Sequence, residues 1–332
     1  MQQKNVDNDI NISHLCVQEN ISLADKNWFG TGGPARFFAE PRDEAELQDL
    51  LCWATACSLP LFILGSGANV LISDQGFDGL VLRYAFKTIG LPSKPDFFDP
   101  STSKVLLEVG AGITIDELIT WCLDNNFLGL EEFSGIPGTV GGSVFINLHY
   151  FEFLLSQFLV RARVMDTRNG QIHEVSVDWF NFGYNESKLQ EQNFILLTAT
   201  FALNEAKEAQ IAYARGRRAE IIRHRQKRYP SQKTCGSFFR NFLTSEVGLE
   251  INGQKMIYVA YYLDKIGVKG ALRIGGAVVS YQHANMLINE GHATSTDIVM
   301  LARTMQQMAY EAFKIILKAE CRLIGFEEYP LL

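Results

Sequence analysis

The chain lacks the segments that direct a protein into or across a membrane. None of its apolar runs approaches the roughly 20 residues that a transmembrane helix needs. The N-terminus, MQQKNVDNDINISHL, is polar and has no apolar centre of the kind found in signal peptides. We therefore expect a cytoplasmic protein without a membrane partner.

Cysteine is scarce and scattered. Six cysteines occur without CxxC spacing and without paired histidines nearby, which argues against zinc sites and disulfide frameworks. We expect no metal site and a reducing compartment. The six are Cys16, Cys52, Cys57, Cys122, Cys235 and Cys321.

Positive charge is also in deficit, with 30 Lys and Arg against 37 Asp and Glu and a net charge of −7. This balance argues against a general nucleic-acid binder. The content of 47% hydrophobic and 20% charged residues is ordinary for a globular protein, and 332 residues leave room for two or three domains. No internal repeat or low-complexity segment is visible.

The common nucleotide-binding fingerprints are missing as well. Residues 65–69, Gly-Ser-Gly-Ala-Asn, follow a predicted strand at 61–64 but lack the third glycine of a dinucleotide motif. A strand at 70–72, not a helix, is predicted to follow, and no GxxxxGK[ST] loop occurs. A strand that enters a Gly/Ser loop can still aim backbone amides at phosphate, so phosphate binding and an ordinary turn both stay open.

Glycine is concentrated in residues 135–147, GIPGTVGGSVFIN. Backbone with so few side chains can approach a flat or phosphorylated ligand closely and offer its N–H groups. The alternative interpretation is a tight turn between two strands.

Hydrophobic periodicity predicts a mixture of strands and helices. Asp43 is a candidate N-cap for a helix with Leu47, Leu50, Leu51 and Ala54 inward, and Thr114 opens a capping box. The basic helix at 205–228 is either a solvated face or an attractor for a diphosphate. A helix at 297–317 is expected to bury Ile298, Leu301, Met305, Met308, Ala312 and Ile316. Further strands are predicted at 36–40, 79–83, 105–109, 160–166, 171–177, 195–202 and 320–325, and a helix at 257–266.

Six motifs occur in one order. They are the loop at 65–69, the glycine-rich stretch at 135–142, Phe-Gly-Tyr-Asn-Glu-Ser at 182–187, Cys-Gly-Ser-Phe-Phe-Arg-Asn at 235–241, Arg-Ile-Gly-Gly-Ala at 273–277 with His-Ala-Asn at 283–285, and Glu-Cys-Arg-Leu-Ile-Gly at 320–325. From about residue 27 to 325 the chain resembles the UDP-N-acetylenolpyruvoylglucosamine reductases, flavoenzymes of bacterial peptidoglycan precursor synthesis.

The resemblance implies an α+β protein with an FAD-binding fold of the vanillyl-alcohol-oxidase type, built from two α+β subdomains, and a C-terminal α+β substrate domain. The expected boundaries are a polar lead-in at 1–20, FAD-binding subdomains at 21–90 and 91–228, and the substrate domain at 229–332. We expect a monomer or weak oligomer.

The resemblance also implies the cofactors FAD and NADPH and a UDP-sugar substrate. NADPH would reduce FAD and leave, and reduced flavin would pass hydride to the double bond of UDP-N-acetylglucosamine enolpyruvate, which gives UDP-N-acetylmuramate. The flavin-binding residues it implies are Gly65, Ser66, Gly67, Ala68, Asn69, Gly135, Ile136, Pro137, Gly138, Thr139, Gly141, Gly142, Ser143, Arg273, Gly275, Gly276 and Ala277.

Hydride transfer to an alkene beside a carboxylate requires a proton donor and stabilisation of the enolate. Ser237 matches the family's proton-donating serine, and Glu320 matches the glutamate that polarises the enol. From the residues alone, Ser237 could equally be a turn serine next to Gly236. Cys235 has no paired histidine and is interpreted as packing.

Two departures from the family pattern concern the substrate. Asn185 stands where the family has an arginine that contacts the enolpyruvyl carboxylate, and asparagine carries no charge. Residues 148–151, Leu-His-Tyr-Phe, are bulky where the family has small residues; His149 is either a partly buried structural residue or a new acid in the site. The other substrate-binding residues implied are Tyr184, Ser187, Lys233, Arg240, Asn241, His283 and Asn285.

These departures leave three functional hypotheses. The first is the reductase itself, with Lys233, Arg240 or an arginine of the 215–225 helix replacing the missing charge. The second is a relative that binds FAD or a nucleotide without catalysis. The third is an FAD-linked oxidase that acts on another substrate.

Overall fold

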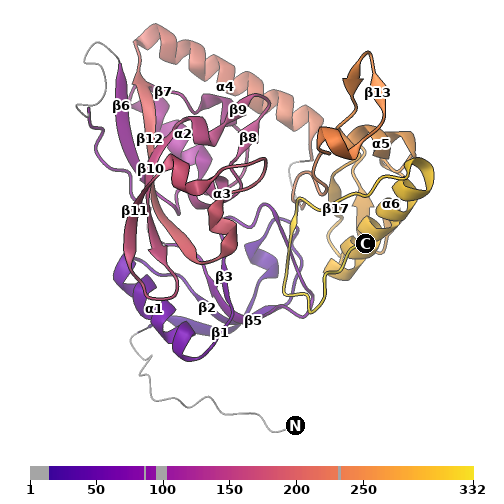
Figure 1. Ribbon diagram of the computed structural model, residues 1–332, viewed down its shortest axis with the longest axis horizontal. Helices are drawn as coiled ribbons and strands as arrows, with labels where there is room; N and C mark the ends of the chain where they lie inside the picture. The colour runs from indigo at the N-terminus through magenta and orange to yellow at the C-terminus, as the bar shows by residue number, and fades with distance from the viewer. Residues whose placement is uncertain (1–14, 86, 95–102, 231–232) are drawn as a thin grey trace. The chain divides into compact units, whose positions relative to one another are not determined.

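The computed structural model describes residues 15–85, 87–94, 103–230 and 233–332 (Figure 1). Most of the polar lead-in, residues 1–14, lies outside the described part. The chain divides into two compact units. Unit 1 contains Phe37–Ser66, Asp78–Ile222 and the described residues before Asn20, and unit 2 contains Asn20–Arg36, Gly67–Phe77 and Arg223–Leu332. The three domain boundaries expected from the sequence stay a prediction.

Unit 1 is built around an antiparallel sheet with the strand order β11-β10-β12-β6. Its central strand β12 carries the run Phe-Ile-Leu-Leu-Thr-Ala-Thr-Phe-Ala-Leu and is buried along most of its length, whereas β11 lies at the edge and is largely exposed. The inner strand β12 is continuously apolar because both of its faces are buried. The strands are β6 (Lys104–Gly110), β10 (Leu159–Asp166), β11 (Ile172–Ser176) and β12 (Phe194–Glu205), and β7 (Phe127–Leu128) pairs with the end of β12.

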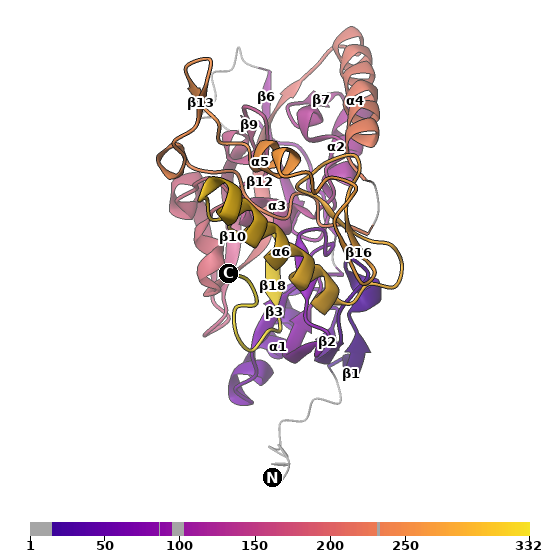
Figure 2. The ribbon, with the colours of Figure 1, turned by 90° about the vertical axis from the view of Figure 1, so that its right-hand side faces the viewer.

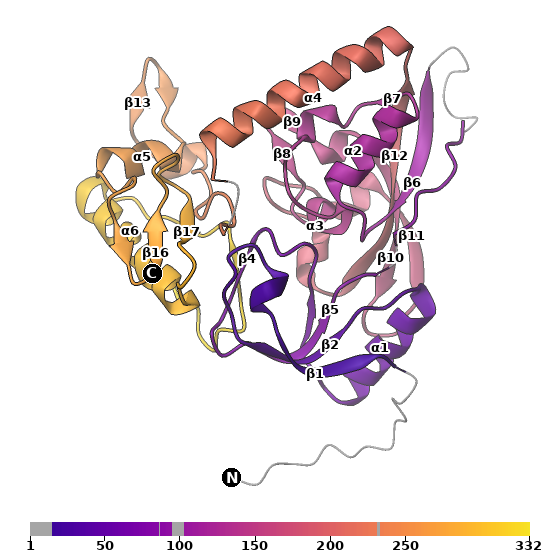
Figure 3. The ribbon, with the colours of Figure 1, turned by 180° about the vertical axis from the view of Figure 1, so that it is seen from behind.

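Two helices, α2 (Ile115–Asp124) and α3 (Val140–Phe145), pack with this sheet into one apolar core (Figure 3). The predicted capping box is confirmed, because the Thr114 hydroxyl accepts the Glu117 amide at 3.1 Å and the Glu117 carboxylate accepts the Thr114 amide at 2.8 Å. Leu118 and Cys122 are buried as expected. A small hairpin, β8 (His149–Tyr150) with β9 (Phe153–Leu154), follows α3.

A second core in unit 1 lies under α1 (Glu44–Ala56). The N-cap prediction is confirmed, since the Asp43 carboxylate accepts the Glu46 amide at 2.9 Å, and Leu47, Leu50, Leu51 and Ala54 are buried. Strand β3 (Leu61–Ile63) pairs in parallel with β5 (Phe77–Leu82). The sheet order is β1-β2-β5-β3, where β1 is Val17–Ser22 and β2 is Pro34–Ala39.

Unit 2 joins three segments that are distant in sequence. Strand β4 (Val70–Ile72) pairs in parallel with the last strand, β18 (Arg322–Ile324). The strands predicted at 70–72 and 320–325 are thereby confirmed. Helix α6 (Ser295–Phe313) packs against β15 and β16 (Figure 2). The remaining elements are β13 (Glu250–Ile251), β14 (Gln254–Lys255), α5 (Val259–Lys265), β15 (Arg273–Ile274), β16 (Ala277–Val279) and β17 (Leu287–Asn289).

The bounds of α6 correct the sequence prediction. The helix begins two residues before Asp297, with Thr294 as its N-cap, and ends at Phe313 because Lys314 adopts a left-handed conformation with φ 57°. The chain beyond Lys314 therefore leaves the helical period. Ala312 and Ile316 are exposed instead of inward, and Leu317 is buried in their place.

Helix α4 (Glu208–Arg228) begins in unit 1 and ends in unit 2. Within the described residues, no helix is both long and apolar enough to cross a bilayer. Nor do three or more metal-ligating side chains come together anywhere in that part of the chain.

The start of α6 depends on a residue that is distant in sequence. The Asp74 carboxylate accepts the backbone amides of Ser295 at 2.8 Å and Thr296 at 2.9 Å, and the Thr296 hydroxyl at 2.7 Å. We expect Asp74→Ala to lower the free energy of unfolding by about 1–2 kcal/mol, because the first-turn amides lose a charged acceptor. Urea unfolding measures the loss. Exposed Glu327→Ala serves as the matched control, and equal stability of the two variants would contradict the assignment.

Candidate active site

The glycine-rich segment of unit 1 is neither a turn between strands nor an extended run. Thr139 is the N-cap of α3, so the apolar residues 144–146 lie at the end of a short helix instead of in a strand. Gly135 and Gly138 have φ values of 72° and 151°, which a residue with a side chain rarely adopts. The chain therefore needs glycine at both positions to enter the helix.

Gly65 and Thr139 bring the two glycine loops of unit 1 together. A Cβ atom on Gly65 would lie 2.8 Å from the Thr139 hydroxyl, so a side chain at position 65 would push the second loop away. The sequence placed these loops 70 residues apart with no signal that they touch. Their bare backbone fits the close approach of a flat cofactor.

The backbone amides at the start of α3 are already used inside the protein. Val140 donates to the carbonyl of Ile113 at 2.7 Å, Gly141 donates to the carbonyl of Ala111 at 2.9 Å, and Gly142 donates to the Thr139 hydroxyl at 3.2 Å. A Cβ atom on Gly141 would also come within 3.2 Å of the Ala111 methyl group. Gly141 and Gly142 are therefore used for close packing inside the protein, in addition to any approach of a ligand that they allow.

Residues 182–187 are tied to the end of α3. The Ser187 hydroxyl donates to the carbonyl of Phe145 at 2.7 Å, and the Asn147 side chain donates to the carbonyl of Gly183 at 3.1 Å. Ser187 and Asn147 are both buried. The motif at 182–187 therefore contacts the residues that directly follow the glycine-rich motif in unit 1.

Asn185 is held in a left-handed conformation with φ 58°, and its backbone carbonyl accepts a hydrogen bond from the side-chain nitrogen of Gln190 at 2.7 Å. Its side-chain nitrogen is buried and has no hydrogen-bond partner within the described residues. The rings of His149 and Tyr184 are in contact beside it, with centroids 5.0 Å apart. Of the bulky residues 148–151, Leu148 precedes the β8–β9 hairpin and is buried, His149 and Tyr150 form β8, and Phe151 begins the turn and is exposed.

In unit 2, residues 67–69 are positioned by two neighbours. Asn27 donates to the carbonyls of Leu23 and Thr31, both at 2.7 Å, and the next amide, of Trp28, donates to the carbonyl of Gly67 at 2.9 Å. No role was assigned to Asn27 from the sequence alone. The signal that could have indicated one is an asparagine in a turn-rich stretch, and the structure shows that this residue is buried.

Ser237 and Glu320 are carried by two paired segments of unit 2. The carbonyl of Phe238 accepts the backbone amides of Glu320 at 2.8 Å and Cys321 at 3.2 Å, and Phe239 forms a bridge with Ala319. The two residues, 83 positions apart, thus lie on adjacent strands of chain. Both are partly exposed, while Cys235 and Cys321 are buried in the apolar core beside them.

Asn285 holds the Ser237 segment from the other side. Its side chain donates to the carbonyl of Phe239 at 2.7 Å and accepts the Phe239 amide at 3.0 Å, while its own carbonyl accepts the Phe238 amide at 2.8 Å. The side chain is thereby engaged with backbone, which gives Asn285 a positioning role. Similarly, the Asn241 side chain accepts the Val259 amide at 3.2 Å.

The cations expected near the substrate differ in their availability. Arg240 forms a two-point ion pair with Glu246 at 2.7 and 2.8 Å, and this contact holds the pKa of Glu246 well below its usual range. Lys233 forms no ion pair within the described residues, and its ammonium group would lie 3.2 Å from a Cβ atom on Gly291. Its own carbonyl accepts the Asn289 amide at 2.9 Å.

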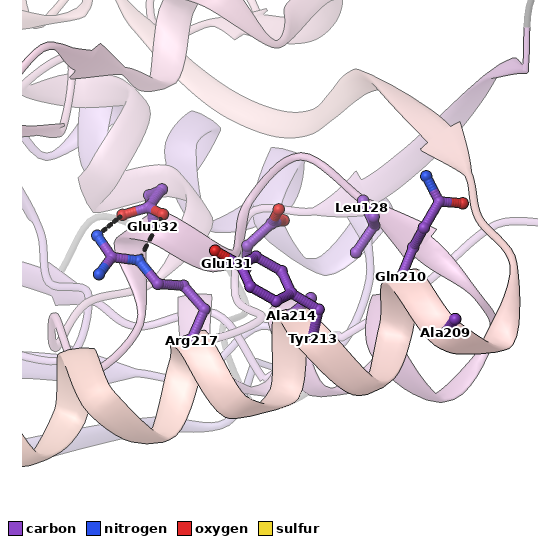
Figure 4. A pocket seen from close by; sticks show the side chains of 8 residues that line it. All are labelled: Leu128, Glu131, Glu132, Ala209, Gln210, Tyr213, Ala214 and Arg217. Atoms are coloured by element: carbon purple, nitrogen blue, oxygen red, sulfur yellow. Dashed lines mark hydrogen bonds and ion pairs between the residues drawn. The ribbon is translucent and has the colours of Figure 1, made fainter.

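The arginines of α4 in unit 1 are largely neutralised by ion pairs. Arg215 contacts Asp124 at 2.7 Å and Arg218 contacts Asp116 at 2.7 Å, both on α2. Arg217 contacts Glu132 at 3.0 Å beside a pocket of about 460 Å³ (Figure 4). These partners favour a structural use of the charges over the attraction of a diphosphate.

The segment 273–277 is shaped by the start of α6. A Cβ atom on Gly275 would lie 2.3 Å from the Asp297 carboxylate, and one on Gly276 would lie 2.4 Å from the Ala293 amide nitrogen. Arg273 pairs with Glu290, and Ala277 is buried in β16. Packing alone therefore requires both glycines, and flavin contact by this segment stays a prediction.

Comparison with known proteins defines the class. Residues 35–176 match the family model of an FAD-binding domain, and residues 227–324 match the C-terminal domain of UDP-N-acetylenolpyruvoylglucosamine reductase. The first match gives this α+β chain an FAD-binding domain and identifies it as a flavoprotein.

The particular family follows from relatives that span nearly the whole chain. The reductase of Synechococcus sp. (strain JA-3-3Ab) is 33% identical over 95% of this chain and 94% of its own, and that of Acaryochloris marina is 32% identical over 93% of each. The crystal structure of the reductase from Thermus caldophilus covers 92% of this chain and 98% of its own, with a TM-score of 0.71 and 27% identity. The chain belongs to the UDP-N-acetylenolpyruvoylglucosamine reductase family, which confirms the resemblance seen in the sequence and the FAD-binding α+β fold.

His283 makes the stability of unit 2 depend on pH. Its ring contacts Tyr229, with centroids 5.5 Å apart, and burial together with the charge of Arg228 lowers its pKa to about 4. Between this value and the ordinary pKa near 6.5, the unfolded chain binds a proton that the folded protein does not.

We therefore expect stability to fall as the pH decreases from about 6.5 to 4, by at most about 1.4 kcal/mol per pH unit from this group. Urea unfolding across this range should give a shallower slope for His283→Gln than for the wild type. Identical slopes would show that His283 is not the group responsible.

Proposed function

We propose that this protein reduces UDP-N-acetylglucosamine enolpyruvate to UDP-N-acetylmuramate, with NADPH as the reductant and FAD as the bound carrier. The observation that carries the proposal is the pairing of the Ser237 and Glu320 segments through the Phe238 carbonyl. An acid and a carboxylate on adjacent segments suit protonation of one carbon of an enolate next to a carboxylate. Bound FAD supplies the hydride chemistry.

Ser237 is proposed to hold the proton that the substrate receives. A serine hydroxyl is a weak acid, so it must be fixed within hydrogen-bond reach of a strongly basic carbon. The backbone pairing of Phe238 and the hydrogen bonds from Asn285 restrict the two residues that directly follow Ser237. Glu320 is proposed to stabilise the enol from the neighbouring segment.

Within unit 1, the flavin is proposed to lie against the backbone of Gly65, Ser66 and residues 135–139, and residues 67–69 stay within the proposed set of flavin contacts. Support comes from the match of residues 35–176 to an FAD-binding domain and from the contact of Gly65 with Thr139. Gly141 and Gly142 stay within the proposed set, but their amides are engaged inside the protein.

The proposal includes the substrate contacts of Tyr184, Ser187, Lys233, Arg240, Asn241, His283 and Asn285. Loss of a charged contact to the enolpyruvyl carboxylate at Asn185 would cost about 2–4 kcal/mol unless another group replaces it. Of the candidates from the sequence, Arg240 and the α4 arginines in unit 1 have carboxylate partners, whereas Lys233 has none among the ion pairs of the described residues.

A cytoplasmic location is also proposed. All six cysteines are free, with three of them buried, which suits a reducing compartment.

A second candidate function rests on Asn185 and the bulky hairpin that follows α3. A relative that binds FAD but does not turn over the sugar would keep the glycine loops and lose the charge at position 185. An FAD-linked oxidase would instead consume oxygen with another substrate.

Anaerobic stopped-flow spectroscopy separates these functions. We expect the purified protein to be yellow, to lose its absorbance near 450 nm (an approximate value typical of flavins) on addition of NADPH, and to regain it on addition of the enolpyruvyl sugar. Flavin that stays reduced in the presence of the sugar would favour the binding protein. Oxygen-dependent turnover with an alcohol or amine would favour the oxidase, and colourless protein that takes up no FAD would refute the proposal.

Ser237→Ala tests the proton donor. We expect the reoxidation of reduced flavin by the sugar to slow by about 10²–10⁴-fold, because general acid catalysis is lost. Reduction by NADPH should keep its wild-type rate. The control is Ser245→Ala, in the exposed 3-10 turn Thr244–Glu246 of the same unit. Reoxidation at the wild-type rate in Ser237→Ala would remove this residue from the mechanism.

A further inference from the structure

His149 lies in unit 1 beside the segment that contains Asn185. Its ring contacts that of Tyr184, the residue before Asn185, at a centroid distance of 5.0 Å and an interplanar angle of 48°. His149 belongs to the β8–β9 hairpin, and Tyr184 belongs to the segment that Ser187 and Asn147 fasten to α3. Both elements lie within unit 1, so their juxtaposition is a property of one compact body.

Asn185 supplies the second, independent observation. Its side-chain nitrogen has less than 1 Å² of accessible surface and no partner within the described residues. A buried donor without an acceptor costs about 1–3 kcal/mol, which an arriving carboxylate oxygen would recover. The side-chain amide of Asn185 can therefore donate to an acceptor that a ligand supplies, since the described residues supply none.

We propose that His149 binds the enolpyruvyl carboxylate of the substrate and, together with the amide of Asn185, replaces the cation that the family pattern places at position 185. This inference rests on the proposed reductase function and deepens it. His149 would act as a substrate-binding residue in its protonated form, with an N–H donor and a positive charge.

The surroundings of His149 are suited to a charge that appears only with the substrate. Burial lowers the pKa of His149 in the free protein. The elements packed against it are β9, the turn Glu131–Phe133 and residues 182–187. Their carboxylates are engaged or exposed: Glu131 accepts the Gly129 amide at 2.7 Å, Glu132 pairs with Arg217, and Glu186 is exposed.

A bound carboxylate would raise the pKa of His149, so substrate and proton would bind together. Affinity for the sugar is then highest at low pH and decreases as the pH rises through the pKa of the complex. A histidine that served only as packing would give no such linkage.

The test compares wild type, His149→Phe and the control His173→Phe, which makes the same change at an exposed position of β11. In His149→Phe we expect kcat/KM for the enolpyruvyl sugar to fall by about tenfold or more, mainly through KM, because a charge-assisted hydrogen bond is lost. Reduction of the flavin by NADPH without sugar should stay within about twofold of the wild-type rate, given that only substrate binding is affected.

Two further variants separate charge from packing. His149→Gln keeps a donor but no charge, so the fall of wild-type kcat/KM with rising pH should disappear in it even if the phenylalanine variant folds poorly. Adding Asn185→Arg to His149→Phe should restore kcat/KM for the sugar. If His149 served only as packing, an added arginine at position 185 would not be expected to restore kcat/KM in the His149→Phe variant.

The outcomes distinguish this inference from the proposed function. If the wild type does not turn over the sugar, the reductase proposal itself fails. If the wild type turns over but His149→Phe and His149→Gln keep its kcat/KM and its pH profile, His149 does not bind the carboxylate and only this inference is overturned.

Discussion

The carbonyl oxygen of Phe238 is the point on which the proposed chemistry depends. It accepts the amides of Glu320 and Cys321 and so joins the Ser237 loop to the last segment of the chain. Strand β18 continues that segment and pairs with β4, and the amide of Arg322 donates to the carbonyl of Asn69 at 3.1 Å. Asn69 at the end of the first glycine loop, the segment after Ser237 and the Glu320 segment are therefore joined by one series of backbone hydrogen bonds in unit 2. Such bonds fix the backbone on which Ser237 and Glu320 stand, and they use no side-chain atom of either residue.

The glycines of the six motifs have two different physical uses. At Gly65 and Gly67 a Cβ atom would meet Thr139 or the carbonyl of Lys26, so these residues let loops approach each other. Gly135 and Gly138 provide positive φ values at the entry to α3. A glycine-rich stretch in the sequence can therefore indicate close packing of loops, contact with a ligand, or both. Glycine content alone could not separate the two, because the neighbour that excludes the side chain is distant in sequence.

Much of the fold could be predicted because its determinants are local. The caps at Asp43 and Thr114 and the apolar run of β12 lie within single elements, and the structure confirms them. The end of α6 could not be predicted, because a left-handed Lys314 interrupts an apolar pattern that continues through Leu317. The helical start at Val140 was missed for a related reason, since Thr139 caps a run rich in glycine and β-branched residues that have low helix propensity.

The site could be predicted in its motifs but not in the partners of its charges. Sequence shows the arginines of α4 without showing that Asp116, Asp124 and Glu132 face them. It likewise shows Arg240 but not Glu246, whose two-point contact fixes that guanidinium. An arginine with a two-point carboxylate partner must give up strong hydrogen bonds before it can bind a substrate anion.

The number of basic residues in the sequence therefore overstates how many cations are available to bind an anion. Arg240 and the α4 arginines of unit 1 look available in the sequence but have carboxylate partners in the structure, whereas the side-chain nitrogen of Asn185 has no partner within the described residues. A buried amide and a histidine that is neutral until an anion arrives avoid the cost of a permanently buried cation. In the proposed site, carboxylate recognition depends on the protonation of His149 as well as on shape, because the amide of Asn185 carries no charge.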